Sequence, residues 1–117
     1  MGPVWDFDYD TFTPRNNQRF AATYGMWMQR IIRDPQFWSL VRERWAELRD
    51  RFKAVEARIE QQREYLRLSN EANIAIWPIY ERVNGDETLS YDAAIDRIIE
   101  QLRTKIAYLD REIANAR

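Results

Sequence analysis

The chain has 117 residues, of which 45% are hydrophobic, 32% charged and 14% aromatic, with a formal net charge of −1. This length and composition predict one globular domain, and the near-zero charge gives no basic face for nucleic acid. The absence of cysteine and histidine excludes a disulfide framework, a thiolate nucleophile and a histidine-based zinc site, and no apolar run is long enough to predict a membrane span.

The first 19 residues are predicted to form an extended segment. In GPVWDFDYD, residues 2–10, aromatic residues alternate with acidic ones, which is the period of a strand: Trp5, Phe7 and Tyr9 against Asp6, Asp8 and Asp10. Residues 11–17 contain a proline and paired asparagines and are predicted to be irregular. We expect a strand or loop over residues 1–19 and a helical bundle over residues 20–117.

Helices are predicted next. The spacing of Phe20, Tyr24, Trp27 and Ile31 is that of one helix face. Asp34 before Pro35 then predicts an N-cap followed by the first residue of a new helix.

The next hydrophobic series predicts one long helix. Its steps alternate between four and three residues, as in a heptad seam: Val41, Trp45, Leu48, Phe52, Val55, Ile59, Gln62, Leu66, Ser69, Asn73 and Ile76. No glycine or proline lies between Gln36 and Trp77, which favours one helix of about 55–60 Å. A break near residues 51–54 stays open, and Pro78 is expected to bend or end the helix.

A last helix completes the predicted fold. The sequence Asn84-Gly85-Asp86 indicates a turn, and Ser90 with Asp92 indicates a helix N-terminus. The seam that follows can lie antiparallel to the long helix: Ile95, Ile99, Leu102, Ile106, Leu109 and Ile113. The fold class is therefore mostly α, with about four helices, two of them long and antiparallel. Large aromatic residues at helical spacing usually pack in a core, so we expect four tryptophans to be core residues: Trp27, Trp38, Trp45 and Trp77. The mixed charges between Arg42 and Arg67 predict a solvated helix face.

Asp6 and Asp8 are candidate metal ligands. Two carboxylates two residues apart can hold Mg²⁺ or Mn²⁺, whereas a polar edge strand or turn is the alternative for so short a pattern. The neighbouring arginines and asparagines could reach a phosphate or the metal, with surface and turn roles as the alternatives: Arg15, Arg19, Asn16 and Asn17.

Several stretches together resemble the CotH-like (spore coat protein H) family of atypical protein kinases. They are GPVWDFD, RDPQFWSLVRERWAELRD, IWPIYE and the terminal LRTKIAYLDREI, and the resemblance runs from Gly2 to about Ile113. It implies transfer of phosphate from ATP to serine or threonine of secreted or spore-surface proteins. It also implies that Asp6 binds the Mg²⁺ or Mn²⁺ ion that bridges the ATP phosphates, and that Asp8 is a second carboxylate of this site.

The position of the motif limits what the chain is expected to do. In the family the W-D-F-D stretch lies well into the protein, after the ATP-binding lobe with its lysine and the catalytic acid. We therefore expect the C-terminal helical part of a kinase, with no catalytic residue of its own and no activity alone. Its expected partners are the missing N-terminal lobe and a protein substrate, with weak self-association through aromatic surface near Trp5. An extracellular or spore-surface location is implied only by the resemblance, and the rival hypothesis is a non-catalytic helical scaffold or protein-interaction module.

Overall fold

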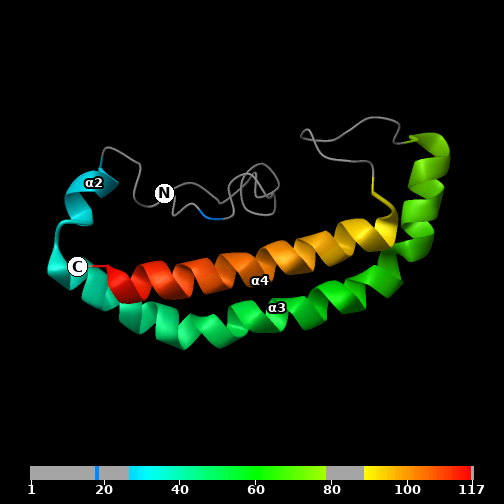
Figure 1. Ribbon diagram of the computed structural model, residues 1–117. Coiled ribbons are helices and arrows are strands. Elements are labelled where there is room, and N and C mark those ends of the chain that lie inside the picture. Colours follow the sequence, from blue (N-terminus) through cyan, green and yellow to red (C-terminus); the bar gives the residue numbers. More distant parts are fainter. Residues whose placement is uncertain (1–17, 19–26, 79–88, 117) are drawn as a thin grey trace.

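The computed structural model describes residue 18, residues 27–78 and residues 89–116. Within these ranges the chain forms three helices, α2 (Met28–Ile31), α3 (Pro35–Ile76) and α4 (Tyr91–Asn115). The mostly helical class is therefore confirmed (Figure 1). The strand and loop predicted at residues 3–10, most of the predicted helix at 20–31 and the predicted turn at 84–86 lie outside the described residues.

The start of α3 follows the predicted N-cap. Asp34 has an extended backbone, and its Oδ1 accepts a hydrogen bond from the Gln36 amide at 2.8 Å, while Pro35 occupies the first helical position. Trp38 is 6% exposed, and its indole Nε1 donates to the Ile32 carbonyl oxygen at 2.7 Å. The sequence DPQFW thus both begins the helix and fixes the chain that enters it.

α3 runs for 42 residues without a break at residues 51–54. It ends at Ile76, where the Trp77 amide donates to the Asn73 carbonyl oxygen at 2.8 Å, just before Pro78. A straight helix of this length would span about 63 Å. The long dimension of the molecule is 53 Å, and Figure 1 shows that α3 bends in its last turns.

α4 lies antiparallel to α3 (Figure 1). The Ser90 Oγ accepts a hydrogen bond from the Ala93 amide at 3.2 Å, and Asp92 lies in the first turn, where a negative charge stabilises the helix N-terminus. The middle and end of the predicted seam of α4 supply most of the buried hydrophobic residues that the structure describes: Ile99, Leu102, Ile106 and Ile113. The structure therefore confirms that the predicted seam of α4 packs in the contact between the two helices.

The side chains of the α3 seam are less buried than those of the α4 seam. Phe52 and Leu66 are each 43% exposed, so the seam forms one side of an open groove and is not a sealed core. The prediction that four tryptophans are core residues was wrong for Trp27 and Trp77, which are 83% and 71% exposed.

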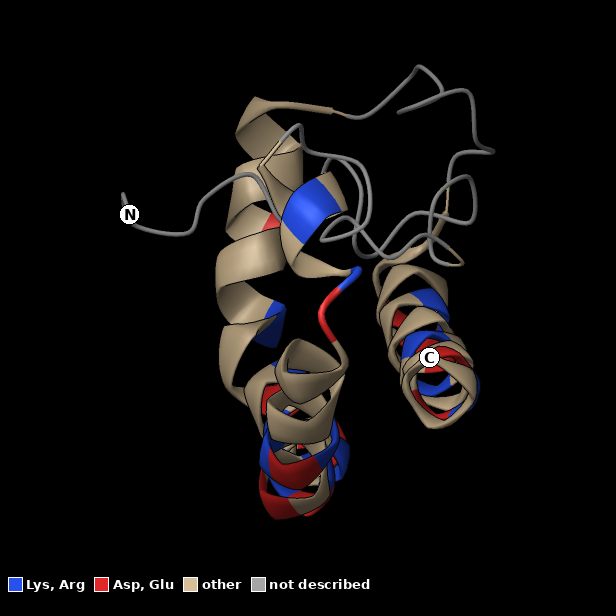
Figure 2. Cartoon of the chain, turned by 90° about the vertical axis from the view of Figure 1, so that its left-hand side faces the viewer, with Lys and Arg blue, Asp and Glu red and all other residues tan. Residues whose placement is uncertain are grey.

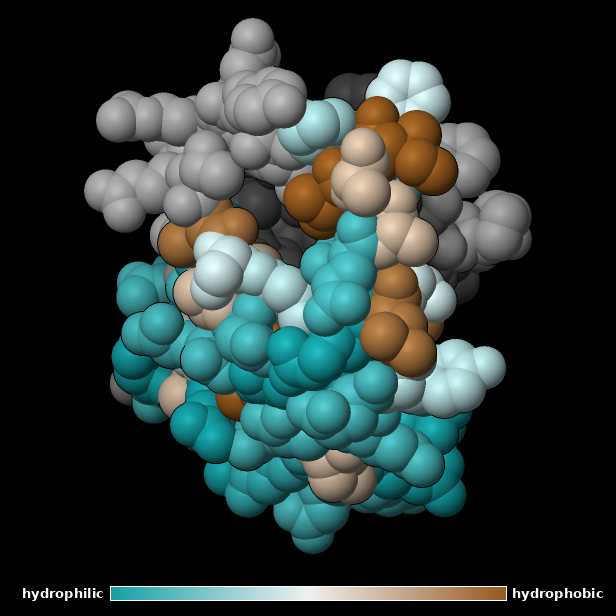
Figure 3. Space-filling view, turned by 90° about the vertical axis from the view of Figure 1, so that its right-hand side faces the viewer, coloured by the Kyte–Doolittle hydropathy of each residue, from teal (hydrophilic) through white to brown (hydrophobic). Residues whose placement is uncertain are grey.

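These two tryptophans are exposed because of where they lie along the chain. Trp27 precedes α3 and Trp77 follows it, so both lie outside the helix whose seam faces α4. Figure 3 shows hydrophobic side chains gathered where α3 extends beyond α4. None of the helices in the described ranges has the length and apolar composition that a membrane span requires.

Candidate functional site

The predicted metal ligands Asp6 and Asp8 lie outside the described residues, as do the arginines and asparagines that follow them: Arg15, Asn16, Asn17 and Arg19. Their assignment therefore stays a prediction. In the part of the chain that the structure describes, no group of three or more acidic side chains is placed to hold a metal ion. The described residues instead form an ordered set of contacts between α3 and α4.

Ion pairs join the two helices along the described residues, and four of these pairs form a regular series that we call the ion-pair ladder. Arg49 donates to both carboxylate oxygens of Asp110, with two N–O distances of 2.6 Å. Further along, each pair is again an arginine with a carboxylate from the opposite helix: Glu56 with Arg103, Arg63 with Asp96 and Arg67 with Asp92. Figure 2 shows that acidic and basic residues lie along both helices.

The ladder follows the heptad repeat of both helices. On α3 its members are separated by seven, seven and four residues, and on α4 by the same steps in reverse. The charges on α3 are not all of one sign, because Glu56 lies between Arg49 and Arg63. A slip of one heptad would place Arg49 opposite Arg103 and Glu56 opposite Asp96. Like charges would then face each other, so the ladder favours the observed register over its nearest alternatives.

Asp110 connects the ladder to an aromatic side chain of α3. Its Oδ1 also accepts a hydrogen bond from the Trp45 indole Nε1 at 2.8 Å. The Trp45 ring stacks on Phe52, with ring centroids 5.6 Å apart. Trp45 belongs to RERWAELRD and Asp110 to KIAYLD. Two of the stretches that carry the sequence resemblance therefore meet in space.

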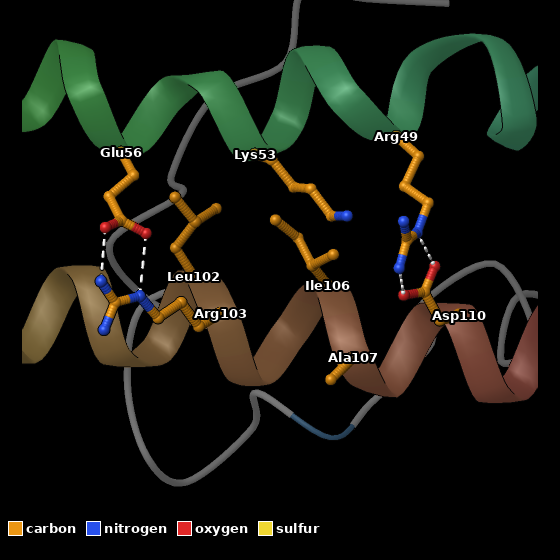
Figure 4. A pocket seen from close by; sticks show the side chains of 8 residues that line it. All are labelled: Arg49, Lys53, Glu56, Leu102, Arg103, Ile106, Ala107 and Asp110. Carbon is orange, nitrogen blue, oxygen red and sulfur yellow. Dashed lines mark hydrogen bonds and ion pairs between the residues drawn. The ribbon is translucent and has the colours of Figure 1, made fainter.

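A pocket of about 240 Å³ lies between the two helices beside the ladder. Figure 4 shows its two ends closed by ion pairs, Arg49 with Asp110 and Glu56 with Arg103. Lys53 extends from α3 toward α4 between these pairs, and the apolar lining comes from α4: Leu102, Ile106 and Ala107. The arginines of the pocket are already bound to carboxylates, so Lys53 supplies its one additional cation.

The electrostatics of the ladder do not suit proton transfer. Hydrogen bonds from Arg49 hold the pKa of the Asp110 carboxyl below its usual value, with a smaller contribution from the Trp45 indole. Hydrogen bonds from Arg103 and Arg67 likewise lower the pKa of Glu56 and of Asp92. A general acid or base needs a pKa near the working pH. These carboxylates stay ionised at neutral pH, and their role is to hold the helices together.

Sequence reasoning missed this ladder. It interpreted the charges between Arg42 and Arg67 as a solvated face, which was wrong for Arg63, whose side chain is 13% exposed. The heptad spacing of Arg49, Glu56 and Arg63 was a usable signal. However, it could be interpreted only against the matching series on α4.

The described residues thus define a helical support in which two helices are fixed in one register. They do not define a reaction centre. A family model described as CotH kinase protein matches residues 2–109, so the chain belongs to the CotH kinase family. Comparison with curated proteins and with solved structures gives no significant match.

Proposed function

We propose that this chain supplies the helical part of a CotH-type protein kinase, together with its metal-binding aspartates. The observation that carries the proposal is the family match over residues 2–109, which includes the DFD stretch, all of α3 and most of α4. The geometry of the helix pair adds that this part of the chain acts as a support.

In this proposal Asp6 binds the Mg²⁺ or Mn²⁺ ion that accompanies ATP. Carboxylate oxygens are the ligands that these hard cations prefer, so the residue types fit the ion. When bound, the ion neutralises charge on the phosphate that is transferred. Asp8 is the second carboxylate of the site and orients or supplements the first.

Further groups are needed for transfer to a serine or threonine. Phosphoryl transfer requires ATP, metal and acceptor to be positioned together. We propose that the ATP-binding lysine and the catalytic acid belong to another lobe of a longer parent protein, which these residues support. The 117-residue chain alone is then expected to be inactive. Following the family resemblance, the substrate is a secreted or spore-surface protein.

The test is transfer of labelled phosphate from ATP by the parent protein with Mg²⁺ or Mn²⁺. Asp6→Ala is expected to reduce transfer by several orders of magnitude, because it removes a metal ligand. Asp8→Ala is expected to reduce it about 10–100-fold if this carboxylate acts through its neighbour. Asp10→Ala is the matched control, since the resemblance assigns no role to this carboxylate. Near-wild-type transfer by a normally folded Asp6→Ala protein would refute the metal assignment.

The rival proposal is a non-catalytic scaffold or interaction module. It is supported by the partly exposed seam of α3, where Phe52 and Leu66 remain accessible. The same assay separates the two proposals. Two results together would favour the scaffold. The parent protein would transfer no phosphate with either metal ion, and its affinity for ATP would be no higher than that of its Asp6→Ala variant.

A further inference from the structure

We propose that the open groove between α3 and α4, which runs along the seam of α3, binds an amphipathic helix with acidic flanks from a partner protein. This interaction surface is independent of the proposed metal site. It follows from the shape, the apolar lining and the charged rim of the groove.

The groove contains two apolar pockets along the seam of α3. The first, of about 280 Å³, is lined by Trp45, Leu48 and Phe52, with Leu109 on α4. The second, of about 300 Å³, has Ile59, Leu66, Ile95 and Ile98 among its lining residues. Val55 lies between the two pockets on the same seam and is 38% exposed. The pockets are therefore linked by accessible apolar surface.

The dimensions of the groove suit a helix. The seam from Val41 to Leu66 covers 26 residues, or about 38 Å of α3. Its steps of four and three residues create the holes into which the side chains of a second seam insert. α4 already occupies the neighbouring side of α3, so an added helix would contact both and close the groove.

The rim of the groove on α3 is basic. Arg44 and Arg58 line the two pockets, and Arg51 lies midway, seven residues from each on the same side of the helix. Arg44 contacts Glu47 at 2.6 Å and Arg58 donates to Gln61 at 2.6 Å. Arg51 forms no ion pair with any residue that the structure describes. The arginine at the centre of the rim is thus free to bind an incoming carboxylate.

The rim on α4 carries charges of both signs. Helical spacing places Lys105 and Glu112 on this side, next to the seam residues. Lys105 lies over the Tyr108 ring, 5.6 Å from its centroid, and Glu112 lies 3.6 Å from Arg111. The α4 rim therefore does not offset the basic α3 rim, and a helix with acidic residues beside its apolar seam matches the groove.

A second copy of the chain fits this groove less well. Antiparallel packing of α3 on α3 centred on Arg51, the middle of the basic rim, would place Arg51 against Arg51 and Arg44 against Arg58. Like charges facing across an interface are unfavourable. The charge pattern therefore selects a different, acidic helix.

Fluorescence anisotropy with two labelled synthetic helices tests the proposal on the full 117-residue chain. Both peptides have about 28 residues with leucine at the seam positions, and they carry either glutamate or lysine beside the seam. We expect the glutamate peptide to bind at least tenfold more tightly, with an affinity that falls as salt is added. Arg51→Glu is expected to weaken its binding at least threefold. Lys53→Glu is the matched control on the ladder side of α3 and should leave binding unchanged.

Three results would overturn the proposal. Equal binding of the two peptides would remove the charge argument, and equal weakening by Arg51→Glu and Lys53→Glu would show non-specific attraction. A dimer in sedimentation that the glutamate peptide does not displace would assign the groove to a second copy. Circular dichroism checks that both variants stay folded, which their exposed positions favour.

Discussion

Replacing Trp45 tests whether the contact between α3 and α4 stabilises the fold as the geometry indicates. Trp45→Phe keeps an aromatic ring against Phe52 but removes the indole N–H that donates to Asp110 at 2.8 Å. Trp45→Ala removes the ring as well. The two substitutions therefore separate the hydrogen bond from the packing.

The expected magnitudes follow from burial. A hydrogen bond to a charged group contributes about 1.5–3 kcal/mol. Asp110 keeps both bonds from Arg49, and its side chain is 28% exposed, so water can replace part of the loss. We expect Trp45→Phe to cost about 1 kcal/mol, or about 4 °C in the thermal midpoint. Loss of a fully buried tryptophan costs about 3–5 kcal/mol; Trp45 is only partly buried, so we expect about 2–3 kcal/mol for Trp45→Ala.

Chemical denaturation followed by the helical circular dichroism signal measures both losses. Phe37→Leu, at a partly exposed aromatic residue that does not contact Asp110, is the control for loss of aromatic area on α3. The reasoning would be refuted if Trp45→Phe had the stability of the wild type, or if Trp45→Ala cost no more than Trp45→Phe.

Three further experiments test the start of α4 and the ladder. Ser90→Ala removes the N-cap of α4 and should cost about 1 kcal/mol in the same denaturation assay; no loss would show that the cap is dispensable. Glu56→Arg faces Arg103 with a like charge and should lower the thermal midpoint, and adding Arg103→Glu should restore it; failure of the double variant to recover would argue against this pairing. The lowered pKa of Asp110 means that its contribution is present above about pH 4 and is lost as the pH falls through that pKa. The stability gap between wild type and Asp110→Asn should therefore be full at neutral pH and close toward about pH 2; a gap that stays constant with pH would contradict the ionic origin.

Local signals predicted the helix boundaries well. Asp34 before Pro35, Ser90 before α4 and Pro78 after α3 each act within a few residues of the backbone they affect. The uninterrupted seam of α3 likewise favoured one long helix, although the sequence left a break near residues 51–54 open. These features depend on neighbouring residues, which is why sequence alone could predict them.

Features that depend on the relative position of the helices were harder to predict. Trp77 lies near the apolar face of α3, yet it follows the last residue of that helix and is exposed. The contact of Trp45 with Asp110 joins residues 65 positions apart, and nothing near either one indicates the other. Asp6 and Asp8 were recognised through a family resemblance, and their roles stay a prediction.

The register of α3 against α4 joins the family's sequence motifs to the fold, and cross-linking measures it directly. Because the chain has no cysteine, pairs can be introduced cleanly with a short bifunctional maleimide as the probe. In the observed register Glu56→Cys with Arg103→Cys should cross-link rapidly within one chain. Arg49→Cys with Arg103→Cys, displaced by one heptad or about 10 Å, should react far more slowly. Faster cross-linking of the displaced pair would contradict the register and the meeting of Trp45 with Asp110.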